Sequence, residues 1–181
     1  MKTIGTAPVS AALIVFCVSI GQAASKPNDV SQAIQARNML EQIDSLSTSI
    51  ADTADELAAK TKGNPDPESP LDRLDMLKEE VNEVGRDLRL LETERGSLTE
   101  WETQAVGQVL PLMELIAAYT NGAIETYTSN QRDLWATAFP GYAARIVEDA
   151  ERVKELLDGH LKLATAREKE QRLESEVEST R

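Results

Sequence analysis

His160 is the only histidine in this chain of 181 residues, and Cys17 is the only cysteine. Catalytic triads built on a histidine base would have to use His160, and the Gly-x-Ser-x-Gly motif of the hydrolases is absent. Zinc sites need clustered cysteines or histidines, and di-iron bundles need two Glu-x-x-His pairs. Leu157 stands three residues before His160, where such a pair has glutamate. The residues therefore predict neither a triad nor a zinc or di-iron centre.

Carboxylates are abundant, since the chain has 31 Asp and Glu residues. A catalytic pair needs opposed carboxylates in a cleft, in unlike environments. Clusters such as 79–83 and 148–151 fall mostly on the polar faces of predicted helices. The segment "NPDPES" is acidic but lacks the ligand spacing of a calcium loop. We therefore predict a protein that is not an enzyme and that has no metal site and no required cofactor.

One cofactor alternative stays open. Met39 and His160 both fall on apolar stripes of helical segments, at the two outer ends of the chain. In an antiparallel arrangement both would lie toward the same end of a bundle. One methionine and one histidine from the outer helices resemble the haem ligation of the cytochrome b562 type. The simpler interpretation makes Met39 a core residue and His160 a core-edge histidine bonded to a carboxylate.

Three aromatic residues gather in "LWATAFPGYAARI", around a Phe-Pro-Gly breaker. Trp135 and Phe139 are four residues apart and share a helix face, and Tyr142 begins the next helix. Aromatic side chains bury much area, so they suit a packed corner between two helices. They are also common interface anchors, which favours a docking patch formed by Trp135, Phe139, Tyr142 and Arg145.

The first 23 residues are typical of a secretory signal peptide. Lys2 supplies the positive region, residues 11–20 form an apolar run too short to span a membrane, and Gly21-Gln22-Ala23 offers a cleavage site. We expect cleavage after Ala23 and a location in the bacterial periplasm or outside the cell, with a retained anchor as the alternative. Removing Lys2 changes the net charge from −12 to −13. So acidic a surface makes nucleic acid a poor partner.

Periodicity and breakers predict four helices, at about 29–62, 70–95, 99–138 and 142–177. In the first, the expected inward stripe is Ala36, Met39, Ile43, Leu46, Ile50, Thr53 and Leu57. In the second, a coiled-coil-like seam has an apolar residue at every 3-4 position, namely Leu74, Leu77, Val81, Val84, Leu88 and Leu91. That seam suits an internal core or a second copy of the chain equally well.

Two further features shape the expected architecture. Gly96, followed by capping-box pairs at Ser97–Glu100 and Thr99–Glu102, predicts a break between the second and third helices rather than one long rod. Residues 168–181 are mostly charged and are expected to fray or project. Residues 24–181 thus predict one all-α domain, an elongated four-helix bundle or a pair of antiparallel long helical hairpins with coiled-coil-like packing.

The "FPGY" turn at residues 139–142, before a final helix in an exported helical chain, resembles the VirB5/TrbJ group of conjugation pilus components. The resemblance implies a signal peptide, a bundle of long helices and a role as a minor pilus subunit of type IV secretion. From the residues themselves, we predict a protein-binding role in the periplasm. A periplasmic holdase chaperone is a further alternative.

Overall fold

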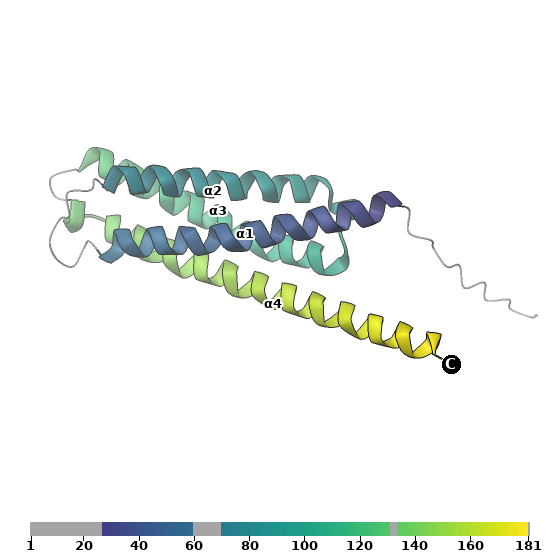
Figure 1. Ribbon diagram of the computed structural model, residues 1–181. Coiled ribbons are helices and arrows are strands. Elements are labelled where there is room, and N and C mark those ends of the chain that lie inside the picture. The colour runs from purple at the N-terminus through teal and green to yellow at the C-terminus, as the bar shows by residue number, and fades with distance from the viewer. Residues whose placement is uncertain (1–26, 60–69, 131–133, 181) are drawn as a thin grey trace, which may run out of the picture.

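The computed structural model describes residues 27–59, 70–130 and 134–180, and their secondary structure is helical throughout apart from short turns. The four long helices are α1 (Pro27–Ala59), α2 (Pro70–Thr93), α3 (Glu100–Ser129) and α4 (Phe139–Ser179). Consecutive helices run in opposite directions along the bundle (Figure 1). Each packs against two others, because α1 contacts α2 and α4 while α3 contacts the same two helices. The chain is therefore an antiparallel four-helix bundle in which α1 and α3 occupy diagonal corners.

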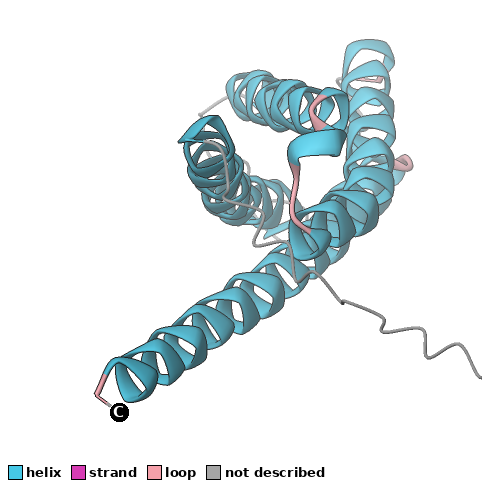
Figure 2. Ribbon diagram, turned by 90° about the vertical axis from the view of Figure 1, so that its right-hand side faces the viewer, coloured by secondary structure: helices cyan, strands magenta, loops and turns pink. Residues whose placement is uncertain are grey.

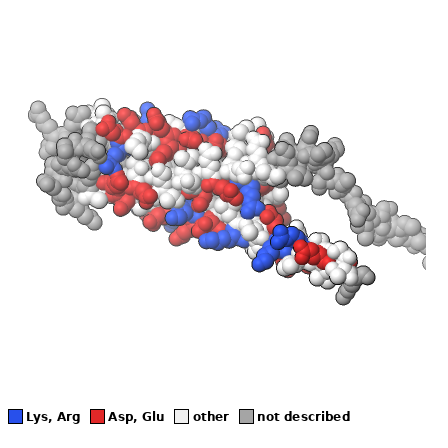
Figure 3. All heavy atoms as spheres, viewed as in Figure 1, with Lys and Arg blue, Asp and Glu red and all other residues white. Residues whose placement is uncertain are grey.

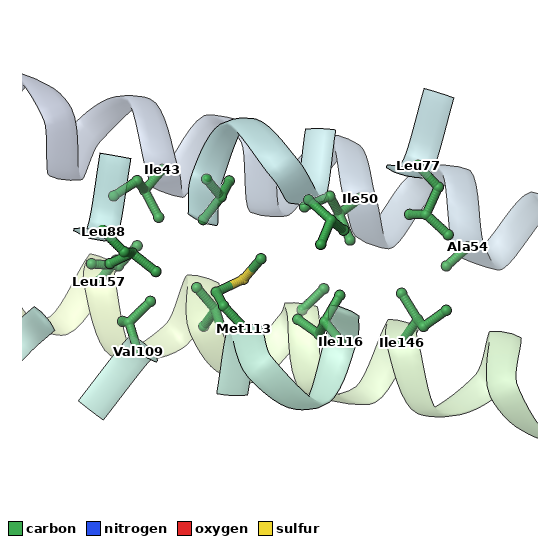
Figure 4. Close-up of a cluster of buried hydrophobic side chains, with 14 of the residues drawn as sticks. Ile43, Ile50, Ala54, Leu77, Leu88, Val109, Met113, Ile116, Ile146 and Leu157 are labelled. Carbon is green, nitrogen blue, oxygen red and sulfur yellow. The ribbon is translucent and has the colours of Figure 1, made fainter. Parts of the chain in front are cut away.

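The core is built from one heptad-spaced seam on each helix. The predicted seam of α2 is confirmed, since all six of its residues from Leu74 to Leu91 are buried. Figure 4 shows Leu77 and Leu88 of this seam in one cluster with residues of the other three helices, including Ile50, Met113 and Ile146. Because the chain's own helices cover the seam, it offers no surface to a second copy, and the predicted alternative of a dimer through Leu74–Leu91 is wrong.

The seam of α1 differs in part from the expected stripe. Five of the seven expected positions are buried, and the full buried set is Ala36, Leu40, Ile43, Ser47, Ile50, Thr53, Ala54 and Leu57. Met39 and Leu46, which were expected inside, are only half-buried at the edge of the core. Ser47 takes a core position because its hydroxyl donates to the carbonyl of Ile43 at 2.7 Å, so its polar group is satisfied within the helix.

The predicted break between the second and third helices is confirmed. α2 ends at Thr93, and a short 3₁₀ turn, η2 (Arg95–Ser97), leads to the start of α3. Thr99 is the cap, since its hydroxyl accepts the backbone N–H of Glu102. The Glu102 carboxylate in turn accepts the backbone N–H of Thr99 at 2.7 Å. This reciprocal capping box satisfies two N–H groups that a helix start would otherwise leave unpaired.

The aromatic corner is organised differently from the prediction. α3 was expected to continue to residue 138, but it ends at Ser129, and a second 3₁₀ turn, η3 (Leu134–Ala136), follows. Phe139-Pro140-Gly141 does not end a helix; it begins α4. A proline in the first turn loses no helical hydrogen bond, because the N–H groups there have no carbonyl partner in the helix, and its fixed φ suits the helix.

The C-terminal half of α4 projects from the bundle. The helix remains continuous to Ser179, so the predicted fraying from residue 168 is wrong while the predicted projection is confirmed. Figures 1 and 2 show α4 angled away from the other helices toward its C-terminal end. No helix among the described residues combines the length and apolarity needed to cross a membrane. The leader, the cleavage site after Ala23 and the connection at 60–69 lie outside the described residues.

Candidate interaction site on helix α4

Phe139 is part of the core and not of an exposed patch. Its side chain is fully buried where η3 meets the start of α4. Its neighbour in the corner, Leu134, is also buried. The prediction that Phe139 is an anchor for a partner is therefore wrong, because a side chain without accessible surface cannot contact another protein in this conformation. The side chain of Trp135 lies outside the described part of the chain.

Tyr142 packs onto α3. Its ring centroid lies 6.4 Å from that of Tyr119, with the ring planes tilted by 35°. The ring also lies against Gly122, where an added Cβ would come within 2.8 Å of it. Arg145 is exposed and forms an ion pair with Glu148 on its own helix at 3.0 Å. Phe139 and Tyr142 of the predicted docking patch thus pack at a helix corner, with Arg145 at its outer edge.

His160 lies at the interface of α4 with α3. Its Nε2 atom is 3.0 Å from the side-chain oxygen of Gln108. The expected bond to a carboxylate is replaced by one to an amide, in which the histidine nitrogen donates. The imidazole is half-buried and joins two neighbouring helices across the outer part of their contact.

Met39 lies on a different face of the bundle. It belongs to the same 3-4 spaced flank of α1 as Gln42, which donates to Glu83 of α2 at 2.9 Å. Met39 thus faces the α1–α2 interface, whereas His160 faces the α3–α4 interface. Both residues are half-buried flank positions and not core positions. The two side chains thus flank different helix interfaces, an arrangement that does not favour shared haem ligation.

Most carboxylates lie on solvated faces, as predicted, but two are buried. Glu102 serves the capping box, and Asp149 lies 3.4 Å from the guanidinium of Arg152 one turn away. Among the described residues, no group of three histidines, cysteines or carboxylates is close enough to hold a metal ion. Each buried carboxylate therefore has a structural partner on its own helix.

A shallow apolar groove of about 250 Å³ lies between α2 and α3. Its lining includes Val81, Leu88 and Met113, with the small residues Gly85 and Ala117 leaving the space open. Those three larger side chains are at most 6% exposed. The groove floor is thus the outer surface of the core, and it presents little free apolar area to a ligand or partner.

Among the described residues, exposed apolar side chains lie on one face at the end of α4. We call residues 165–180 the α4 extension, and every one of them is exposed. Leu173 and Val177 are 51% and 59% exposed, and Leu163, just before the extension, is 49% exposed. With Ala166 and Glu170 they form the α4 stripe, spaced alternately by three and four residues on one helix face.

A polar clamp marks the point where the α4 extension leaves the bundle. Arg37 of α1 binds both carboxylate oxygens of Glu168, at 2.8 and 2.9 Å, and the hydroxyl of Thr165 at 2.9 Å. On the other side, α3 begins at Glu100, and His160 is already level with Gln108. At one residue per 1.5 Å, α3 has no residues beyond the level of about 168. On the side of α1, Figure 1 shows α1 and α4 separating beyond the clamp, and every residue from 169 to 180 is exposed.

In comparisons with protein families, characterised proteins and solved structures, no match to this chain was found. The resemblance of "FPGY" to the VirB5/TrbJ group therefore stays a prediction. The candidate site is thus defined by the geometry of α4 alone. From the sequence, Leu173 and Val177 are assigned only to the charged segment 168–181. With Leu163, Ala166 and Glu170 they keep an alternating spacing of three and four residues, and that spacing was the signal that could have identified the stripe.

Proposed function

We propose that this protein is an exported, non-enzymatic helical bundle that acts by binding another protein through the α4 extension. The signal-peptide pattern of residues 1–23 supports export. The single observation that carries the binding role is the α4 stripe, whose leucines and valine are about half exposed on a helix that leaves the bundle. Phe139 and Tyr142 of the aromatic corner serve the packing of the bundle instead.

Helix physics supports a partner at this position. An isolated helix shorter than about 12–15 residues is marginal in water, and tertiary packing supplies most helical stability. The α4 extension has 16 residues, and the 12 that follow its clamp, residues 169–180, are all exposed. A partner that covers Leu173 and Val177 would remove apolar surface from water, at about 25 cal/mol per Å². Binding would therefore stabilise both the contact and the helix.

The binding role can be tested by photo-crosslinking in the host cell. A photoreactive amino acid replaces Leu173, which lies on the stripe, and in a matched control it replaces Ser175, which is exposed on the opposite face. We expect a discrete crosslinked product from position 173 and much less from position 175. Equal or absent crosslinking at the two positions would refute the proposed site.

Export has its own test. The amino terminus of the protein recovered from the periplasmic fraction should be Ala24, since cleavage is expected after Ala23. Recovery of the full-length chain from the cytosolic fraction would contradict export, whatever the crosslinking result.

A further inference from the structure

The charges of α4 divide into two blocks around the stripe. Residues 162–172 carry four basic side chains and two acidic ones, whereas residues 173–180 carry three acidic side chains and no basic one. Figure 3 shows basic groups where the extension leaves the bundle, with acidic groups further along the projecting end. The basic residues are Lys162, Arg167, Lys169 and Arg172, and the acidic ones of the last block are Glu174, Glu176 and Glu178. When two such helices run antiparallel, the basic block of each lies beside the acidic block of the other.

From this pattern we infer that the partner covering the α4 stripe is a second copy of the chain, paired antiparallel along its own α4 extension. The inference rests on the proposed function and names its partner. The seam positions alternate between those that begin a three-residue step and those that end one. In an antiparallel pair, each position of the first kind faces a position of the second kind on the other copy. A single register aligns every seam position from 163 to 180 with a seam position of the other copy. Its facing pairs are Leu163 with Thr180, Ala166 with Val177, and Glu170 with Leu173.

The flanking charges favour this register. In it, Lys169 of one copy lies near Glu176 of the other, and Arg167 lies near Glu174. Twofold symmetry repeats both contacts, giving four pairs of opposite sign and none of like sign at these flanking positions. Exposed pairs of this kind are weak individually, but they select orientation and register.

Parallel pairing is less favourable. It would place Glu170 against Glu170 in the seam, and it would bring Lys162 near Arg167 of the other copy. Like charges at such positions destabilise a helix pair. Antiparallel pairing also sends the two acidic bundles to opposite ends of an overlap of about 27 Å, the length of 18 helical residues. That separation reduces the repulsion between two strongly negative bodies.

The association should be reversible and not permanent. The seam has few large apolar residues, and Glu170 occupies a position within it. A carboxylate facing Leu173 must remain partly hydrated, which limits how much apolar surface the pair can bury. The bundle core does not depend on this contact, because the residues of the stripe lie outside the core.

Sedimentation equilibrium of the mature chain, from about 1 µM to about 1 mM, tests the inference. We expect a monomer–dimer equilibrium that Leu173→Glu weakens by about tenfold or more, since the charge enters the seam. Leu90→Glu is the matched control, because Leu90 is 43% exposed on α2, away from the stripe. A monomer at every concentration, or a dimer that Leu173→Glu leaves unchanged, would overturn the inference. Circular dichroism would show that both variants retain the bundle.

Charge reversal distinguishes antiparallel from parallel pairing. Lys169→Glu alone places like charges together and should weaken the dimer. Adding Glu176→Lys restores the opposite-charge contact in the antiparallel register and should recover the affinity. In parallel pairing Lys169 would face Glu174 instead, so the second substitution would give no recovery and the antiparallel inference would fail.

The crosslinking experiment separates this inference from the proposed function. A product from position 173 with the mass of two copies supports both. A product containing a different protein, together with a purified chain that stays monomeric, supports the proposed function and refutes self-pairing. The lack of any product specific to position 173 refutes the proposed function itself.

Discussion

The ring of Tyr142 lies directly against the backbone of Gly122, at the place where α4 first packs onto α3. A Cβ built on Gly122 would lie 2.8 Å from the ring Cζ and 2.9 Å from Cε1. Carbon atoms do not approach so closely, so the missing side chain of Gly122 is what lets the ring settle on α3 beside Tyr119. Gly122 is thus a packing residue, although glycine in a helix interior costs about 1 kcal/mol relative to alanine.

We predict that the effect of Gly122→Ala on the stability of the fold changes sign with the residue at position 142. In the natural chain it should destabilise the fold by about 1 kcal/mol, because overpacking costs about 1–3 kcal/mol and the helix gain offsets part of it. In a Tyr142→Ala background the same change should stabilise by up to about 1 kcal/mol. Urea unfolding of the four chains of this double-mutant cycle measures the difference. Equal effects in both backgrounds would show that the ring does not need the space.

Phe139→Ala should destabilise the bundle strongly. Phe139 is fully buried, and truncating a buried phenylalanine costs about 3–5 kcal/mol through lost burial and the cavity left behind. Arg145→Ala serves as the comparison, since Arg145 is exposed and bonded only to Glu148 one turn away, and it should stay within about 0.5 kcal/mol. A thermal shift of similar size for the two variants would contradict the packed-corner assignment.

Sequence patterns predicted the bundle well wherever each heptad position held a large apolar residue. The α2 seam is the clearest case, because all six of its residues are leucine or valine. In α1 the pattern was ambiguous. Small or polar residues, Ser47 and Ala54, occupy core positions, while the larger Met39 and Leu46 lie at the flank. Side-chain size favoured Met39 and Leu46 over the neighbouring positions Leu40 and Ser47, and only the packing of the other helices decides between them.

The candidate site was harder to predict than the fold. Aromatic residues can anchor a core or an interface, and whether Phe139 was exposed depended on how η3 and α4 meet. Pro140 is likewise compatible with two positions, just after the end of one helix or in the first turn of the next. The spacing of the α4 stripe is present in the sequence, but its exposure depends on where the neighbouring helices end, since α3 begins level with Glu168 and does not reach the later residues of α4.

The capping box at the start of α3 can be measured directly. Thr99→Ala should destabilise the fold by about 1 kcal/mol, because one N–H group near the helix start loses its side-chain acceptor. Ser97→Ala is a close control, since the Ser97 hydroxyl donates to the Glu94 carbonyl and caps no helix. Its cost should be below about 0.5 kcal/mol. Equal costs at the two positions would contradict the assignment of Thr99 as the cap of α3.

Asp44 makes the stability of the bundle depend on pH. Partial burial raises the pKa of its carboxyl, the nearby charge of Asp158 raises it further, and Lys154 and Lys162 oppose the shift. One carboxylate oxygen is buried without a hydrogen-bond partner among the described residues. Because the folded chain holds this proton more tightly than the unfolded chain, the favourable contribution of Asp44 is complete at low pH. It is lost as pH rises through the raised pKa.

Asp44→Asn should therefore stabilise the bundle at pH 7, where the natural residue is a disfavoured charge. The gain should be smaller than the roughly 1–3 kcal/mol of a fully buried unpaired group, since Asp44 is only half-buried. It should shrink at about pH 3, below the ordinary aspartate pKa of about 3.9, because the natural residue is then protonated as well. Urea unfolding at the two pH values measures both gains, with the exposed Asp55→Asn variant as control. A gain that is equal at both pH values, or a loss at pH 7, would show that the charge of Asp44 is compensated in the fold.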